Sequence, residues 1–352
     1  MSSRTLASRW GGVASGERVG IGRLATILLE MTDALPGPRS GIWYRMRTPM
    51  AALAGAVLAL SLAACSGAET DADDASLETA PLAASPARRN FFTLTNAPFA
   101  DTRHATALVY LPRGFNPAGP LNLVVHFHGW ANCIENDGEA TGTACTPGGP
   151  VRTPHNYIAQ LDASGANAAL VLIERAYDQS SSADGKLSQS GFFRAMIDEL
   201  LPHIGALAGR TYAESDVGEI ALSSHSGGYL AVADALSAGG LTNKIHTVML
   251  FDSLYGNLAQ YEAWLRPNLG KIRFSLVYTD GGGTLANSQA LAALVKQWLA
   301  AAHLPASTLI DDRTTSTFTD AQFATPIIFK HSALAHDATA SYYFSRFVRH
   351  AF

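Results

Sequence analysis

Charged residues are scarce in this sequence, and they do not gather into patches. Only 15% of the 352 residues are charged, and the net charge is −4. Proteins that bind nucleic acid usually carry a strongly basic patch or stripe, so the lack of Lys and Arg clusters gives no reason to expect a nucleic-acid partner. For the same reason, no cationic cluster favours an acidic substrate.

The N-terminal quarter lacks a hydrophobic run long enough to cross a membrane. Residues 51–64 carry only small or apolar side chains and one serine, whereas a membrane-spanning helix needs about 20 apolar residues. Two arginines precede the run, as is typical of a secretory signal peptide. We therefore expect a signal peptide over residues 46–64, with translation starting at Met46. Residues 1–45 would then be an extension that is not native, or an over-long leader.

The apolar run ends in Leu-Ala-Ala-Cys at Cys65. This ending resembles the cleavage box of bacterial lipoproteins, in which the cysteine receives a diacylglycerol and becomes the new N-terminus. The resemblance implies a lipid anchor at Cys65, in the bacterial cell envelope. Ser66 after the cysteine implies the outer membrane, facing the periplasm or the cell surface. A plain secretory signal cleaved near Ala64 is the alternative.

Residues 65–89 differ in composition from the rest of the chain. They are rich in Ala, Ser, Pro, Asp and Glu and contain few large apolar side chains. Such a segment cannot bury enough apolar surface to offset the entropy lost on ordering. We expect a disordered tether between the lipid anchor and a folded domain.

Cysteine is rare, with three in the chain. Cys133 and Cys145 lie close together in one predicted loop, apart from Cys65. In an oxidising periplasm they would form a disulfide, which for a loop of this size stabilises a protein by about 3 kcal/mol in the chain-entropy model. In a cytosolic protein they would be free thiols. No group of His, Cys and Asp has metal-ligand spacing and no Gly-rich phosphate loop is present, so we expect neither a metal nor a cofactor.

Apolar strands alternate with helical segments from residue 90 to the end of the chain. Residues 121–130 read as a buried strand that ends in His-Gly, and 288–302 carry apolar side chains on one helical face. Strands that are apolar through most of their length are buried on both faces, which predicts an α/β domain over residues 90–352 with a mostly parallel sheet between helices. Further strands are expected at 91–94, 107–110, 168–173, 220–222, 245–251, 272–278 and 326–329, and further helices at 192–206, 340–349 and between Gly228 and Gly239.

The most informative stretch is Ser224-His225-Ser226-Gly227-Gly228, which lies between the strand at 220–222 and the next helix. A strand that turns sharply into a helix strains its central residue, and small residues are needed two positions before and after it. Ser226 would lie at the helix N-terminus, where N–H groups and the helix dipole favour developing negative charge. The pattern predicts a nucleophilic serine. A plain Ser/Gly-rich turn is the alternative.

With this turn in place, the chain resembles the α/β-hydrolase superfamily from about residue 90 to Phe352. The order of features matches: His-Gly after an early strand, the serine turn, then an acid and a histidine late in the chain. Ser224 stands where the family pattern Gly-x-Ser-x-Gly has its first glycine. The resemblance implies an α/β-hydrolase fold with a mostly parallel central sheet and helices on both faces.

The resemblance also implies an activity. It indicates a serine hydrolase that cleaves a small carboxylic ester or amide through an acyl-serine intermediate, without a cofactor. Two alternatives remain: a serine peptidase or cell-wall amidase, and a catalytically inactive surface-binding lipoprotein of the same fold. The implied partners are a small-molecule substrate and, through the lipid anchor, a membrane.

A serine hydroxyl needs a base within hydrogen-bonding distance and a group that orients this base. The resemblance favours His336, which follows the last predicted strand and precedes a helical segment, over His331, expected in or against that strand. Asp280 follows a strand but belongs to a common Asp-Gly turn. Asp252 ends an apolar strand, where an ionised carboxylate needs a partner. The sequence leaves the choice between the two acids open.

An oxyanion hole is implied as well. Its donors would be the backbone N–H of Gly227 and one from the loop after His-Gly, where Trp130 beside Gly129 is the expected residue. Donors of this kind each lower the barrier by about 3 kcal/mol. Three nearby histidines are expected to pack or to hold loops rather than to transfer protons: His126, His128 and His225.

Overall fold

The computed structural model describes residues 88–99, 103–176 and 185–352. The predicted signal peptide, Cys65 and most of the predicted tether lie outside the described residues. The first strand among the described residues begins at Arg88. Among the described residues, no helix has both the length and the apolar character needed to cross a membrane.

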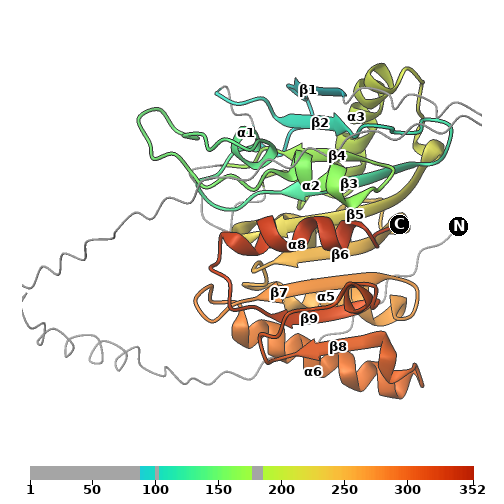
Figure 1. Ribbon diagram of the computed structural model, residues 1–352. Helices are drawn as coiled ribbons and strands as arrows, with labels where there is room; N and C mark the ends of the chain where they lie inside the picture. The colour runs from blue at the N-terminus through green and yellow to red at the C-terminus, as the bar shows by residue number, and fades with distance from the viewer. Residues whose placement is uncertain (1–87, 100–102, 177–184) are drawn as a thin grey trace, which may run out of the picture. The chain divides into compact units, whose positions relative to one another are not determined.

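A nine-stranded sheet forms the centre of the domain (Figure 1). Its spatial order is β1-β2-β4-β3-β5-β6-β7-β9-β8. Strand β2 is antiparallel to β1 and to β4, and the other neighbouring pairs are parallel, so the predicted mostly parallel sheet is confirmed. The strands are β1 (Arg88–Phe92), β2 (Ala107–Leu111), β3 (Leu121–Phe127), β4 (Ala168–Ile173), β5 (Val217–His225), β6 (Ile245–Phe251), β7 (Arg273–Tyr278), β8 (Leu309–Asp312) and β9 (Ile327–His331).

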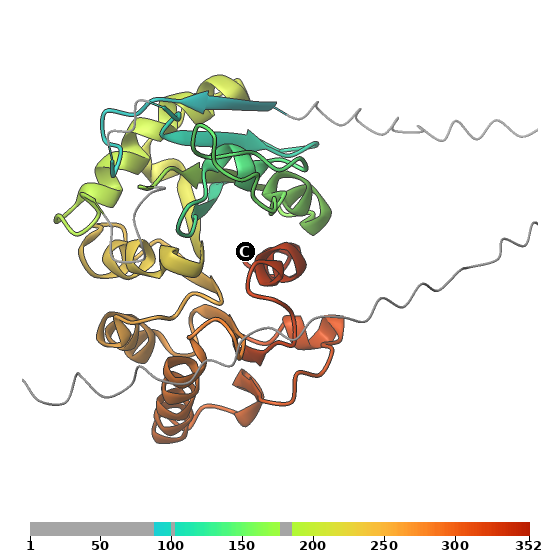
Figure 2. The same ribbon diagram turned by 90° about the vertical axis from the view of Figure 1, so that its left-hand side faces the viewer.

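Helices cover both faces of this sheet (Figure 2). Successive side chains of a strand point to opposite faces, and Leu123 and Val125 of β3 belong to one buried cluster while Val124 belongs to the other. The first cluster includes residues of α3 (Phe192–Ala208), α4 (Tyr229–Ala238), α5 (Leu258–Asn268) and α6 (Leu285–Ala301). The second includes residues of α1 (Ile134–Gly138), α2 (Tyr157–Ser164), α7 (Asp320–Phe323) and α8 (Ala338–Val348).

The parallel strands bring several loops to one edge of the sheet. Phe127 at the end of β3 pairs with Ser224 of β5, and His225 at the end of β5 pairs with Phe251 of β6. Because these strands are adjacent and end in register, the segments after them lie side by side. The predicted oxyanion loop, the predicted nucleophile and Asp252 all come from these segments.

Strand β8 was not predicted from the sequence. Its four residues, Leu-Ile-Asp-Asp, are half acidic and only partly buried, so they lack the apolar pattern of the central strands. The carboxylates are held by ion pairs, among them one between Asp312 and the buried Lys330 of β9. Because these charges are paired, the polar segment can form the outermost strand of the sheet, next to β9.

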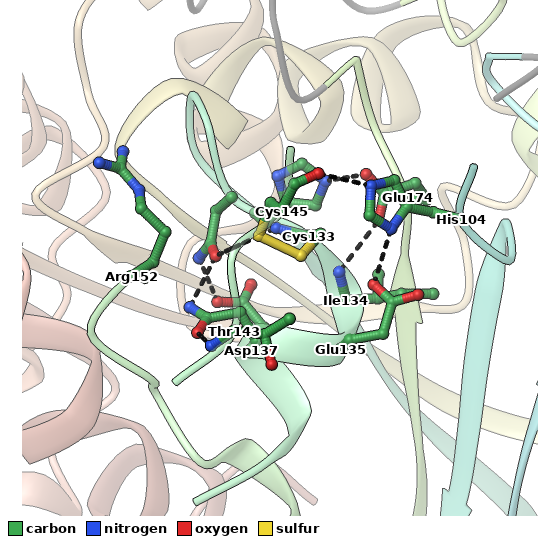
Figure 3. The surroundings of a disulfide bond; sticks show 12 residues. His104, Cys133, Ile134, Glu135, Asp137, Thr143, Cys145, Arg152 and Glu174 are labelled. Carbon is green, nitrogen blue, oxygen red and sulfur yellow. Dashed lines mark hydrogen bonds and ion pairs between the residues drawn. A yellow bond between two sulfur atoms is a disulfide. The ribbon is translucent and has the colours of Figure 1, made fainter. Parts of the chain in front are cut away.

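A disulfide joins Cys133 to Cys145 in the loop after β3 (Figure 3). Their Cα atoms are 5.5 Å apart, within the usual range for a disulfide. The bond encloses α1 and fixes the shape of a long loop at the carboxyl edge of the sheet. The structure thus contains the disulfide expected from the sequence.

Candidate active site

Ser226 occupies a sharp turn between β5 and α4. The turn η2 (Ser226–Gly228) comes directly after the strand, and Ser226 has a φ of 50°, in the left-handed region that most residues avoid. A Cβ at Gly228 would lie 2.3 Å from the Phe127 carbonyl oxygen and 2.8 Å from Ser224 Cβ, which explains why this position is glycine. Two positions before Ser226, the Ser224 hydroxyl is buried and lies 2.8 Å from Ser253 Oγ.

His336 and Asp252 form a hydrogen-bonded pair at the same edge of the sheet. The distance from His336 Nδ1 to Asp252 Oδ2 is 2.8 Å. Asp252 is fully buried and also accepts hydrogen bonds from the hydroxyls of Thr279 and Thr284. Burial raises the pKa of Asp252, but the hydrogen bonds from His336, Thr279 and Thr284 outweigh it and hold the pKa below its ordinary value. The carboxylate is therefore ionised and fixes the tautomer of His336.

Asp280 and His331, the two rival residues, form a separate pair. His331 Nε2 lies 2.9 Å from Asp280 Oδ1, and the Asp280 side chain is 78% exposed. His331 lies at the end of β9, as expected, and its Nδ1 donates to the Arg313 carbonyl oxygen at 3.2 Å. Of the two candidate acids, Asp252 is therefore the one hydrogen-bonded to His336, whereas Asp280 is hydrogen-bonded to His331.

The predicted oxyanion loop lies against Ser226. A Cβ at Gly129 would approach Ser226 Cβ to 2.7 Å, so glycine is required for this contact. The loop is held in place by His128, whose Nδ1 donates to the Gly129 carbonyl oxygen at 2.7 Å. His128 is buried and acts as a structural residue, as predicted from the sequence.

Arg175 connects the two sides of the predicted oxyanion hole, and sequence reasoning missed it. It is 3% exposed, and its Nη1 donates to the His128 carbonyl oxygen at 2.9 Å and to the Gly227 carbonyl oxygen at 3.1 Å. One guanidinium therefore fixes the loop after β3 relative to the serine turn. Arg175 was missed because it differs from the other arginines only in being buried. The burial of a residue in an irregular loop leaves no pattern in the sequence.

Tyr255 is a second residue that sequence reasoning missed. Its phenol interacts with Ser226 and with the charge of Asp252. Burial, and then the nearby charge of Asp252, raise the pKa of Tyr255 to about 12, so the phenol keeps its proton. Its position in the loop that Asp252 begins is the only sequence signal that could have identified it.

A buried polar network lies behind this site, and Figure 3 shows part of it. Asp137 of α1 is fully buried, and its Oδ1 accepts hydrogen bonds from His155 Nδ1 at 2.7 Å and from the Asn132 amide at 2.5 Å. Burial raises the pKa of Asp137, but His155 and His126 outweigh it and hold the pKa below its ordinary value. The ionised carboxylate thereby fixes the ring of His155, which lines the same cavity as Ser226.

His225 fills the space between His155 and His336. Its ring centroid lies 4.6 Å from each of the other two ring centroids. Burial, and then the two neighbouring histidines, hold the pKa of His225 well below its ordinary value. The neutral ring is a packing element, which agrees with the role expected from the sequence.

A small cavity of about 230 Å³ connects these groups. Sites for drug-sized ligands usually measure about 300–1,000 Å³, so this cavity suits a small substrate group. Its rim includes Trp130 and Val151, which are 60% and 69% exposed. The lining residues are Gly129, Trp130, Asn132, Val151, Arg152, Thr153, His155, His225, Ser226, His336 and Asp337.

Two groups of side chains in the described part of the chain bring three ligand atoms close enough to share a metal ion. In the first, Cys133 is committed to the disulfide, and in the second His336 is already bonded to Asp252. The first group is therefore not an open set of ligands. The groups are His104, Cys133 and Glu135, and His225, His336 and Asp337.

No family model and no curated protein matches this sequence. Among solved structures, a mutant of the feruloyl esterase module from Clostridium thermocellum, complexed with sinapinate, is 14% identical, with a TM-score of 0.46, covering 79% of this chain and 92% of that one. The S-formylglutathione hydrolase from Staphylococcus aureus is 11% identical, with a TM-score of 0.41 and coverage of 77% and 97%. A ferulic acid esterase from Anaeromyces mucronatus, in complex with ferulic acid, is 14% identical, with a TM-score of 0.40 and coverage of 77% and 92%.

The fold is defined by the topology itself. The sheet has an antiparallel second strand, crossovers that order the next strands β4-β3-β5-β6, and helices on both faces. A strained serine comes after β5 and opens into α4. This chain has the α/β-hydrolase fold.

Proposed function

We propose that this protein is a serine hydrolase that cleaves carboxylic esters or amides through an acyl-Ser226 intermediate. One observation carries the proposal: His336, oriented by the buried Asp252, lines the same small cavity as Ser226 on its strained turn. A nucleophile, a base and a group that orients the base are the parts that acyl transfer by serine requires.

Each residue has a defined task in the proposed reaction. The Ser226 oxygen attacks the carbonyl carbon, and His336 accepts the hydroxyl proton and then gives it to the leaving group. Asp252 stays ionised and stabilises the imidazolium that forms. The N–H groups of Gly227 and Trp130 would donate to the oxyanion. Water then attacks the acyl group with His336 as base, which releases the acid and restores Ser226.

A fluorophosphonate probe tests this proposal directly. The purified full chain should gain the mass of one adduct, and Ser226→Ala should gain none. His336→Ala should also fail to react within the time in which the native protein is fully labelled, whereas His331→Ala should react like the native protein. A native protein that is folded and disulfide-bonded but takes no adduct would support an inactive binding protein instead.

We also propose that the protein is lipid-anchored in a bacterial envelope through Cys65. The Leu-Ala-Ala-Cys ending supports this, and the Cys133–Cys145 disulfide is of the kind that persists in oxidising compartments. Labelled fatty acid should be incorporated into the native chain and not into Cys65→Ser, and only the native chain should sediment with membranes. Equal incorporation into both chains would rule out Cys65 as the anchor.

A further inference from the structure

Arg152 lines the cavity but has no task in the proposed reaction. Its guanidinium makes one long hydrogen bond, from Nη2 to the Trp130 carbonyl oxygen at 3.4 Å. Among the described residues, no carboxylate lies within ion-pair distance of it. Figure 3 shows the side chain extending away from Glu135, Asp137 and Glu174. A half-buried cation without an anionic partner therefore lies beside the residue expected to supply an oxyanion donor.

The backbone around Arg152 is held by the disulfide loop. Its N–H donates to the Thr143 carbonyl oxygen at 3.1 Å. The side chain of Asn136 accepts from Thr143 N at 2.8 Å and donates to the Thr153 carbonyl oxygen at 3.1 Å. The backbone of Arg152 and Thr153 is thus held by hydrogen bonds to the disulfide loop. This fixes the position from which the Arg152 guanidinium reaches the cavity, as a binding residue requires.

The rim of the cavity offers an apolar surface next to this cation. Trp130 and Val151 line the cavity and are two of the three large hydrophobic side chains that are exposed in the described part of the chain. Asp337 is the only carboxylate among the lining residues, and Arg152 is the only lining Lys or Arg. The lining therefore combines apolar surface for a hydrocarbon with one guanidinium for an anion and one carboxylate.

We propose that the substrate is an ester that carries a carboxylate a few carbons from the reacting carbonyl, and that Arg152 binds this carboxylate. The inference rests on the proposed serine hydrolase function and narrows it to half-esters of short dicarboxylic acids. A guanidinium matches a carboxylate through two parallel hydrogen bonds. The volume of about 230 Å³ suits a short acyl chain, which would lie against Trp130 and Val151.

The first test compares monomethyl glutarate with dimethyl glutarate, which has the same carbon chain without the charge. Methanol release is measured by proton NMR. The native protein should have the higher kcat/KM on the charged ester. Arg152→Gln should lower kcat/KM on monomethyl glutarate by about 10- to 100-fold, which is the range for losing a charged hydrogen bond, and change it on dimethyl glutarate by less than about twofold.

Asp337→Asn is the matched control, because it neutralises the other charged side chain at the cavity that has no task in the reaction. This variant should keep the preference for the charged ester. A native protein without that preference, or an Arg152→Gln variant that loses activity equally on both esters, would overturn the assignment.

A binding measurement separates this inference from the hydrolase proposal. Isothermal titration calorimetry on Ser226→Ala should give a lower Kd for monomethyl glutarate than for dimethyl glutarate. In the double variant with Arg152→Gln, the two Kd values should be equal. If the native protein cleaves neither ester while this pattern is observed, the anion site stands and the hydrolase proposal on these esters fails. If Ser226→Ala shows no charge-dependent binding, the anion site is refuted whatever the activity.

Discussion

At the scale of single residues, Asp252 and Asp280 show how context separates two carboxylates that look alike in the sequence. Both follow strands at the same edge of the sheet, Asp252 directly after β6 and Asp280 one residue further on after β7. Asp252 is fully buried and bonded to His336 and two threonine hydroxyls, whereas Asp280 is largely solvent-exposed and bonded to His331. Only the first environment holds an ionised group in a fixed orientation beside a histidine that reaches the cavity.

Replacing each acid by its amide tests this difference. Asp252→Asn should lower kcat by about 10³- to 10⁴-fold, because the amide can donate to His336 Nδ1 and so favours the wrong tautomer. Asp280→Asn should leave kcat within about twofold of the native value, since its partner His331 does not line the cavity. Steady-state rates on the best ester found, with circular dichroism to check folding, measure both. Equal losses in the two variants would contradict the assignment of the acid.

At the scale of elements, the serine turn is held between its neighbouring strands. Gly228 packs against the Phe127 carbonyl of β3. From the other side, the Ser253 hydroxyl after β6 donates to the Ser226 carbonyl oxygen at 2.7 Å. The turn therefore has no space to relax, and its strained conformation is maintained by contacts on both sides.

A methyl group at Gly228 should be costly. Gly228→Ala should reduce the free energy of unfolding by about 1–3 kcal/mol or more, because the added Cβ meets backbone that cannot move without displacing β3. Gly119→Ala is the control, since nothing lies within 4 Å of a Cβ built there. Urea denaturation measures both variants. An unchanged midpoint for Gly228→Ala would show that the turn has room for a methyl group.

The disulfide loop is a second element with a measurable contribution. Cys133→Ser with Cys145→Ser should lower the free energy of unfolding by about 2–4 kcal/mol. Because Arg152 is bonded to this loop at Thr143, the double variant should also weaken the preference for monomethyl glutarate. Denaturation and the two-ester comparison measure these effects, with Cys65→Ser as the control that should change neither. Full selectivity without the disulfide would show that other contacts hold Arg152.

At the scale of the whole molecule, the sheet separates two apolar clusters, and buried histidines gather at its carboxyl edge. His225 is neutral in the folded protein because burial and its histidine neighbours depress its pKa. When the chain unfolds, this histidine regains its ordinary pKa of 6.5. Below that pH the unfolded chain binds a proton that the folded chain excludes, so acidification favours unfolding.

The pH dependence of stability tests this reasoning. Between pH values of about 6.5 and 5, His225→Gln should lose less stability than the native protein, with a slope smaller by up to about 1.4 kcal/mol per pH unit. His303→Asn, a change at an exposed position, should keep the native slope. The measurement is the free energy of unfolding at several pH values across this range. If it falls with the same slope in His225→Gln and in the native protein, His225 is not neutral in the folded protein.

Much of this architecture was predictable because its signals are local. The serine turn depends on small residues within a few positions of Ser226, and the central strands are continuous apolar runs. The acid could not be chosen, because the partners of Asp252 come from Thr279, Thr284 and His336, which are distant in the sequence. Arg152 lies in an irregular loop without periodicity, so only the folded chain shows that it faces the cavity.

The two residues with the most demanding roles are also in unfavourable conformations. Ser226 and Asp252 have φ angles of 50° and 45°, and such conformations cost about 1–3 kcal/mol each. Glycine at position 226 would relieve the strain of the turn but would also remove the hydroxyl, so the less strained chain would be one without the proposed nucleophile.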